Sequence, residues 1–234
     1  MAMIKKRILV VEDDRDINEL IRYNLEREGF EVLSLYDGGQ VQDVVATRKP
    51  DLILLDLMLP ERDGLDIARE LKRESNTRNI PVIMITAKGT ESDVVVGLSM
   101  GADDYIPKPF SPQVLVARIK AILRRKADSE EIPIEQKVRQ WGDLYLDLLK
   151  HKVSFKGQSI HLTSIEFDIF EFLSRSPGRV FNREQILDNV WKDGKFIVDR
   201  AVDVHVRGLR KKLGPAQDYI ETVRGVGYCF KETE

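Results

Sequence analysis

The chain has 234 residues, a formal net charge of −2 and 42% hydrophobic residues, which is typical of a folded globular protein. No apolar run approaches the roughly 20 residues that a membrane-spanning helix needs, and we expect no membrane partner. The single cysteine, Cys229, excludes an intramolecular disulfide and a cysteine-rich zinc site, so we expect a cytoplasmic protein. Charge is balanced in both halves, and a nucleic-acid site would therefore have to come from local clustering of basic residues.

The first half of the chain alternates short apolar runs with longer amphipathic stretches. The runs are rich in branched residues and predict strands at 7–11, 31–35, 51–55, 81–85 and 103–106. The amphipathic stretches predict helices near 15–28, 38–48, 64–74, 90–100 and 111–126. This alternation predicts a doubly wound α/β domain with a five-stranded parallel sheet over residues 1–126.

The second half follows a different order. Residues 127–139 are acidic and poor in apolar side chains, which predicts a linker, with a continuation of the preceding helix as the alternative. Beyond the linker, the pattern predicts strands at 141–147, 151–155 and 159–162, helices near 164–175, 183–191 and 199–213, and strands at 219–223 and 228–231. The order predicts a separate α+β domain over residues 140–234.

Acidic residues follow two of the predicted strands. Glu12, Asp13 and Asp14 come directly after the first strand, and Asp56 ends the third. If the strand order is 2-1-3-4-5, these ends are neighbours at the point where the winding reverses. Clustered carboxylates repel one another, and oxygen ligands of this kind favour Mg²⁺. The alternative is helix capping alone, for which Asp14 is well placed.

Two more polar residues belong to the same edge of the predicted sheet. Thr86 ends the fourth strand and Lys108 follows the fifth, while the small Ala87 leaves room beside them. Carboxylates, an aspartate nucleophile, a hydroxyl and a lysine together suit phosphoryl transfer, because metal and lysine stabilise the charge on the transferred oxygens.

The segments around these positions resemble the receiver domain of response regulators of the CheY type. The similarity covers residues 5–126 and is carried by LVVEDD, LLDLMLPERDG, VIMITA and GADDYIPKPF. It implies that Asp56 accepts the phosphoryl group and that Thr86 and Lys108 contact the phosphoryl oxygens. It further implies a Mg²⁺ site formed by Glu12, Asp13, Asp56 and the Met58 carbonyl oxygen. It also implies that Thr86 and Tyr105 act as a switch pair. The peptide bond between Lys108 and Pro109 would be cis.

The predicted helix at 200–213 has an apolar side and a basic side. At ~100° per residue, its apolar residues (Val202, Val206, Leu209 and Leu213) lie nearly opposite its basic ones (Arg200, Arg207 and Lys211), with Arg210 and Lys212 at the flanks. Such a helix suits a DNA major groove, and an arginine at the tip of the following hairpin suits a minor groove. By itself, a basic helix face is more often simply solvated.

The C-terminal segments resemble the winged-helix DNA-binding domain of the OmpR/PhoB family over residues 140–234. The similarity is carried by HLTSIEFDIFEFLSRSPGRVFNREQIL, DRAVDVHVRGLRKKLG and YIETVRGVGYCF. It implies DNA contacts by Arg200, Val204, Arg207, Lys211, Thr222 and Arg224. It also implies a contact with RNA polymerase in Trp191–Val198, although Trp191 suits a core aromatic equally well. Gly208, close to the presumed groove-facing side, departs from relatives that have a larger polar residue there.

The family resemblance also implies a dimer face in the receiver. Its candidate residues are Val94, Asp104, Val114 and Arg118, of which Asp104 and Arg118 match a charged pair of the family. Val94 and Val114 stand where another charged pair is usual, and they predict a more apolar dimer contact.

Together these patterns predict a phosphorylation-activated transcriptional regulator of a bacterial two-component system. A sensor histidine kinase would phosphorylate Asp56 with Mg²⁺, and the resulting homodimer would bind promoter DNA. Enzymatic activity would be limited to self-phosphorylation and self-dephosphorylation. A phosphatase with an aspartyl-phosphate intermediate is less well supported, because Met58 stands where an acid/base residue would be needed. Two rival interpretations are a regulator that is independent of phosphorylation and a C-terminal domain that binds protein.

Overall fold

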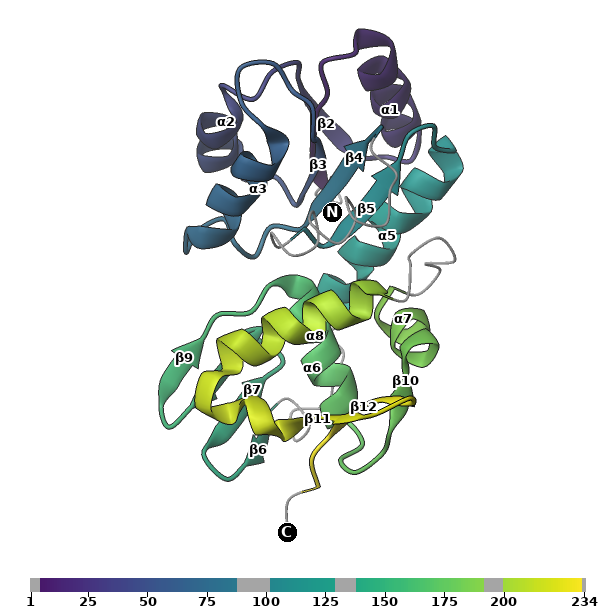
Figure 1. Cartoon of the computed structure of the whole chain (residues 1–234). Coiled ribbons are helices and arrows are strands. Elements are labelled where there is room, and N and C mark those ends of the chain that lie inside the picture. Colours follow the sequence, from purple (N-terminus) through teal and green to yellow (C-terminus); the bar gives the residue numbers. More distant parts are fainter. Residues whose placement is uncertain (1–4, 88–101, 129–137, 192–199, 233–234) are drawn as a thin grey trace. The chain divides into compact units, whose positions relative to one another are not determined.

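The computed structural model describes residues 5–87, 102–128, 138–191 and 200–232 (Figure 1). The chain divides into two compact units, Met1–Leu123 and Arg124–Glu234. Within the described ranges, no helix combines the length and the apolar character required to cross a bilayer.

The first unit is built on a five-stranded parallel sheet with the order β2-β1-β3-β4-β5. Its strands are β1 (Arg7–Val11), β2 (Glu31–Leu35), β3 (Leu52–Asp56), β4 (Val82–Thr86) and β5 (Asp104–Pro107). β3 and β4 are buried along their whole length, which explains their unbroken apolar runs. Because β1 lies beside β3, the predicted strand order is confirmed, and residues that follow these two strands share one edge of the sheet.

The described helices of this unit are α1 (Arg15–Arg27), α2 (Val41–Arg48), α3 (Gly64–Arg73) and α5 (Pro112–Asp128). α1 and α5 cover one face of the sheet, where Ile21, Leu25 and Ile119 pack against Val10, Leu54 and other strand residues. α2 and α3 lie together on the other side of the sheet in Figure 1. The helix predicted near 90–100 lies outside the described residues.

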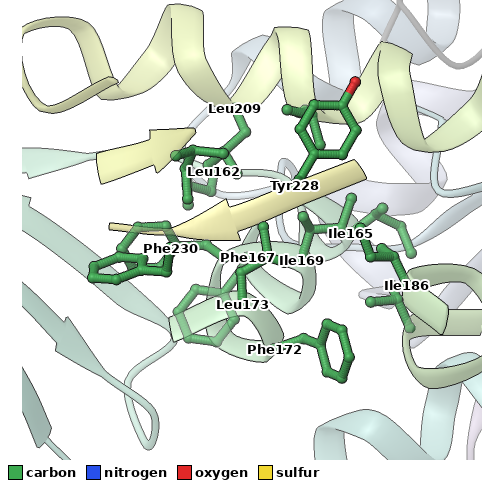
Figure 2. Close-up of a cluster of buried hydrophobic side chains, with 14 of the residues drawn as sticks. Leu162, Ile165, Phe167, Ile169, Phe172, Leu173, Ile186, Leu209, Tyr228 and Phe230 are labelled. Atoms are coloured by element: carbon green, nitrogen blue, oxygen red, sulfur yellow. The ribbon is translucent and has the colours of Figure 1, made fainter. Parts of the chain in front are cut away.

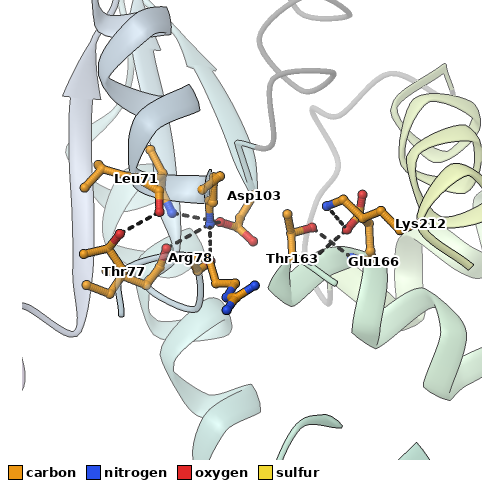
Figure 3. A network of polar contacts seen from close by, with 10 residues as sticks. Leu71, Thr77, Arg78, Asp103, Thr163, Glu166 and Lys212 are labelled. Carbon is orange, nitrogen blue, oxygen red and sulfur yellow. Dashed lines mark hydrogen bonds and ion pairs between the residues drawn. The ribbon is translucent and has the colours of Figure 1, made fainter. Parts of the chain in front are cut away.

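A buried ion pair joins α3 to the strands that follow it. The ammonium group of Lys72 lies 2.6 Å from Asp103 Oδ2 and donates to the carbonyl oxygen of Ile80 at 2.8 Å, and Asp103 Oδ2 also accepts from the Val82 amide at 2.9 Å. Thr77 Oγ1 donates to the Leu71 carbonyl oxygen at 2.7 Å within the same turn (Figure 3). These bonds fix the connection from α3 to β4 and the start of β5.

Among its described residues, the second unit contains two antiparallel sheets and three α-helices. The first sheet comprises β6 (Val138–Trp141), β7 (Leu144–Asp147), β8 (Lys152–Phe155) and β9 (Gln158–Ile160) in sequence order. The remaining elements are α6 (Ser164–Ser174), β10 (Phe181–Asn182), α7 (Arg183–Trp191), α8 (Arg200–Leu213), a 3₁₀ helix (Gly214–Tyr219), β11 (Ile220–Val223) and β12 (Gly227–Phe230). The second sheet has the order β10-β12-β11, and β11 and β12 form the wing, a hairpin with its turn at Arg224–Val226.

Several elements differ from the sequence predictions. The single strand predicted at 141–147 is wrong: Gly142, with φ +57°, turns the chain between two paired strands, β6 and β7. α5 continues to Asp128, and β6 begins at Val138 within the predicted linker. The two-residue strand β10 has no prediction, because a pair of residues is too short to show a period.

Aromatic and aliphatic side chains together form the core of the second unit (Figure 2). Phe170 on α6 and Phe230 on β12 are both 0% exposed, with ring centroids 5.7 Å apart. Leu209 from α8 and Tyr228 from β12 enter the same cluster, so one core holds α6, α8 and the wing together. Trp191 ends α7 and is buried in this core. Of the two roles that the sequence left open for it, the structure thus supports that of a core aromatic.

Candidate functional site

Three carboxylates meet at one edge of the receiver sheet. Glu12 and Asp13 follow β1, Asp56 ends β3, and ligand oxygens of all three lie within 4.8 Å of one another. Glu12 and Asp56 are buried, whereas Asp13 is exposed. The neighbouring strands therefore bring together the acidic residues that the sequence singled out.

Lys108 lies between two of these carboxylates. Its ammonium nitrogen is 2.6 Å from Asp56 Oδ2 and 2.7 Å from Glu12 Oε1. Its backbone N–H donates to the Thr86 carbonyl oxygen at 2.7 Å, and the Lys108–Pro109 bond is cis. This lysine therefore reaches the pocket from the β5 end and joins it to the end of β4.

Burial shapes the charges of the pocket. The pKa of Glu12 is raised to about 7, chiefly by desolvation and also by the nearby Asp56, although the hydrogen bond from Lys108 lowers it. Desolvation would lower the pKa of Lys108, but its bonds to Asp56 and Glu12 outweigh this effect and raise it. The lysine is therefore a cation among three acidic side chains, and the oxygen donors of these side chains suit a hard divalent metal ion.

Backbone contacts hold Asp56 in place. Met58 donates its N–H to Asp56 Oδ1 at 3.0 Å, and its own side chain is exposed. A Cβ atom at Gly64 would lie 2.1 Å from the Asp56 carbonyl oxygen, so only glycine fits where α3 begins. Gly64 ends one of the segments that resemble the receiver family, but the sequence did not show that it packs against the Asp56 backbone.

Asp14 and Asn18 support the other side of the pocket. Asp14 Oδ1 accepts from the N–H groups of Asp16 and Ile17, so Asp14 is the N-cap of α1, as the sequence suggested. Asn18 is buried, and its side-chain amide donates to the carbonyl oxygens of Glu12 and Leu35, both at 3.1 Å. Asn18 was not among the residues predicted from the sequence; an amide in line with the buried Ile21 and Leu25 was the available signal.

Thr86 and Tyr105 lie on adjacent strands and are both buried. The β4–β5 register pairs Met84 with Tyr105 and Thr86 with Pro107. Since residues two apart on a strand share a face, Thr86 and Tyr105 point to the same side of the sheet.

The predicted dimer-face charges pair within this chain. Arg118 Nη1 lies 2.7 Å from both carboxylate oxygens of Asp104, and the two residues are 6% and 3% exposed. Val114, on the same helix, is half-buried. Val94 lies outside the described residues.

α8 has the two sides that the sequence predicted. Val202, Val206, Leu209 and Leu213 are buried against the core. Arg200, Arg207 and Lys211 are exposed, and the half-buried Val204 falls in line with them at helical spacing. The exposed side of α8 is thus a basic stripe.

Side-chain contacts fasten the wing and α7 to α8. Arg210 donates to the Ile220 carbonyl oxygen at 2.6 Å and to Thr222 Oγ1 at 2.8 Å. On the same helix, Asp203 Oδ1 accepts from the Tyr228 hydroxyl at 2.6 Å and from Arg183 Nε at 2.7 Å. Arg210, expected at the flank of the basic side, therefore holds the wing. Thr222 is its partner, and Arg224 lies exposed in the turn of the wing.

Comparison with known proteins assigns both units. Residues 8–120 match the response regulator receiver domain, and residues 157–230 match the family described as "Transcriptional regulatory protein, C terminal". The phosphate regulon transcriptional regulatory protein PhoB of Pseudomonas aeruginosa is 45% identical over 230 residues, which cover 97% of this chain and 98% of the relative. This chain belongs to the OmpR/PhoB family of response regulators. It is a PhoB-like transcriptional regulator with a receiver and a DNA-binding domain.

A further relative and two solved structures align with nearly the whole chain. PhoB of Escherichia coli is 45% identical over 96% of this chain and 97% of its own length. The structure of a RitR C128D mutant aligns with a TM-score of 0.77 and 31% identity, covering 97% of this chain and 99% of that one. DrrB of Thermotoga maritima, described as an OmpR/PhoB homologue, aligns with a TM-score of 0.50 and 32% identity over 98% and 100% of the two chains.

Proposed function

We propose that a sensor histidine kinase activates this regulator by transferring a phosphoryl group to Asp56, and that the phosphorylated chain binds promoter DNA as a homodimer. The observation that supports this proposal most directly is the position of Lys108. Its ammonium group lies within 2.7 Å of both Asp56 and Glu12 at the sheet edge where Asp13 is the third acid.

In the proposed transfer, a carboxylate oxygen of Asp56 attacks phosphorus as the bond from phosphorus to the histidine nitrogen breaks. Lys108 and the Thr86 hydroxyl contact the phosphoryl oxygens, and the lysine stabilises their negative charge. The residues that would hold Mg²⁺ are Glu12, Asp13, Asp56 and, through its carbonyl oxygen, Met58. The ion would neutralise charge between these carboxylates and the incoming phosphoryl group.

The proposed response passes from Thr86 to Tyr105. A phosphoryl group at Asp56 adds charge and acceptor oxygens, which draw the Thr86 hydroxyl towards them. Thr86 and Tyr105 lie on the same face of adjacent strands, so a shift of the first changes the space available to the second. This change would remodel the face that contains Asp104, Val114 and Arg118.

Dimerisation would use that face. Within one chain, Arg118 and Asp104 already form an ion pair. A dimer that uses these residues would either add contacts to this pair or replace it with pairs between the two subunits. Val94 and Val114 would contribute an apolar contact in place of a second charged pair. We therefore expect self-association to depend less on salt than an interface of charged pairs would.

The DNA-binding domain would place α8 in a major groove. Arg200, Val204, Arg207 and Lys211 form the stripe available to bases and phosphates, and Arg224 on the wing would enter the adjacent minor groove. Thr222, bound to Arg210, would contact the DNA backbone from the wing. The segment proposed to contact RNA polymerase is reduced from Trp191–Val198 to residues 192–198, because Trp191 is buried and therefore not accessible to a partner.

The first test is the intact mass of the protein after incubation with acetyl phosphate, with and without Mg²⁺. We expect a single phosphoryl adduct that requires Mg²⁺ and is absent from the Asp56→Asn variant. Asp66→Asn is the matched control, because Asp66 is an exposed aspartate of α3 in the same domain. An adduct on the Asp56→Asn variant, or none on the folded wild type with either acetyl phosphate or a cognate kinase, would contradict the proposal.

A further inference from the structure

A buried carboxylate stands at the start of α6. Glu166 Oε2 accepts from the Thr163 N–H at 2.7 Å, and Thr163 Oγ1 accepts from the Glu166 N–H at 3.4 Å, which together form a capping box. Glu166 is only 5% exposed. A carboxylate this deeply buried needs a counter-charge as well as the N–H groups of its own helix.

The counter-charge comes from α8. Lys212 Nζ lies 2.5 Å from Glu166 Oε2, so the last turn of α8 is bound to the first turn of α6 (Figure 3). The Glu166 side chain is 6% exposed and the Lys212 side chain 38%. The pair is thus partly shielded from solvent, and its lysine is already neutralised within the protein.

Gly208 lies one turn before Lys212 and faces the same carboxylate. A Cβ atom at position 208 would lie 2.7 Å from Glu166 Oε1. The sequence placed this glycine near the groove-facing side of the helix, and the structure adds that its missing side chain leaves space for the Glu166 carboxylate. A larger residue here would have to displace either the carboxylate or α8.

We propose that Glu166 is a positioning residue for DNA recognition: its carboxylate fits against Gly208, binds Lys212 and fixes α8 against α6. This inference rests on the proposed function, in which α8 reads DNA. It divides the neighbouring basic residues of the helix by role. Lys212 holds α6 and Arg210 holds the wing, whereas Lys211 makes no side-chain ion pair or hydrogen bond with any residue that the structure describes.

The division predicts different salt dependences for two adjacent lysines. Each phosphate neutralised by a lysine releases counterions and adds about 0.9 to the slope of log affinity against log salt. Lys211 is free to do this. Lys212 is already paired with a carboxylate and contributes little.

The first experiment compares Lys212→Gln with Lys211→Gln, which is the same substitution one residue away. The probe is a duplex that the wild-type chain enriches from a random-sequence pool, titrated by fluorescence anisotropy at several salt concentrations. We expect Lys211→Gln to lower the slope by about 0.9 and Lys212→Gln to leave it nearly unchanged. Equal losses of slope would overturn the inference.

The second experiment tests the space at Gly208. Alanine favours a helix over glycine, so helix propensity alone predicts that Gly208→Ala raises the melting temperature of the domain. The inference adds a prediction about DNA binding. We expect Gly208→Ala to lower the ratio of specific to non-specific DNA affinity by roughly fivefold, because the added methyl group shifts α8 against Glu166. Glu166→Asp, which draws the carboxylate back by one methylene, should reduce this loss in the double variant.

A purely structural role gives a different result. It would change the melting temperature of Gly208→Ala but leave the affinity ratio per folded molecule as in the wild type, and the inference would then be wrong. If the wild-type chain, phosphorylated or not, enriched no DNA sequence, the proposed DNA-binding function itself would fail before any variant was compared.

Discussion

The acidic pocket of the receiver and the basic stripe of α8 are two different ways to build a charged site. The pocket gathers residues from the ends of separate strands, and Glu12 and Asp56 in it are buried with Lys108 between them. The stripe lies on one helix, with Arg207 and Lys211 exposed. In the pocket the loss of one charge leaves another unpaired at low dielectric, whereas on the stripe water and salt replace what is lost.

The largest effect should come from breaking a buried pair away from the pocket. Arg118→Met removes the buried guanidinium whose Nη1 contacts both carboxylate oxygens of Asp104, and we expect a loss of about 3–5 kcal/mol in the free energy of unfolding of the receiver. Hydrogen exchange of receiver peptides in the full chain measures this loss.

Lys120→Met is the control for Arg118→Met on the same helix. Lys120 and its partner Glu28 are about half exposed, and loss of an exposed pair should cost less than ~1 kcal/mol. Similar costs for the two variants would contradict the distinction between buried and exposed charges.

A smaller effect, on rate, should follow from the loss of the lysine in the pocket. Lys108→Ala removes the cation that stabilises the transferred oxygens, and we expect phosphorylation of Asp56 by acetyl phosphate to slow by roughly 100-fold. Time-resolved intact mass gives the rate, with Lys120→Ala as a control that leaves the pocket intact. A rate within a factor of two of the wild type would show that Lys108 has no part in the transfer.

The smallest of these effects should occur on the stripe. Arg207→Ala removes one exposed cation from α8, and we expect DNA affinity to fall by roughly fivefold at fixed salt, with a loss of about 0.9 in the salt slope. Titration of the selected duplex measures both quantities. Unchanged affinity would count against α8 as the DNA reader and would leave the exposed side of the helix merely solvated.

Local patterns predicted most of the described elements and the members of the pocket, because strand ends are readable and parallel strands bring their ends together. Asp14 as a cap and the apolar side of α8 followed from local sequence in the same way. Contacts between distant elements did not follow from local sequence. The residues around Asn18, Arg210 and Glu166 give no indication of the strand, wing or helix that each of these side chains binds. Gly208 shows the limit most clearly, since its helical position was readable but the carboxylate beside it comes from α6.

The glycine that begins α3 also constrains how this regulator can evolve. Gly64 lies against the backbone of Asp56, where even one methyl group would collide with the carbonyl oxygen. A substitution there cannot be accommodated by repacking side chains, because the obstacle is the main chain of the proposed phosphoacceptor itself. A chain that keeps this packing of α3 against β3 must therefore keep glycine as the first residue of α3.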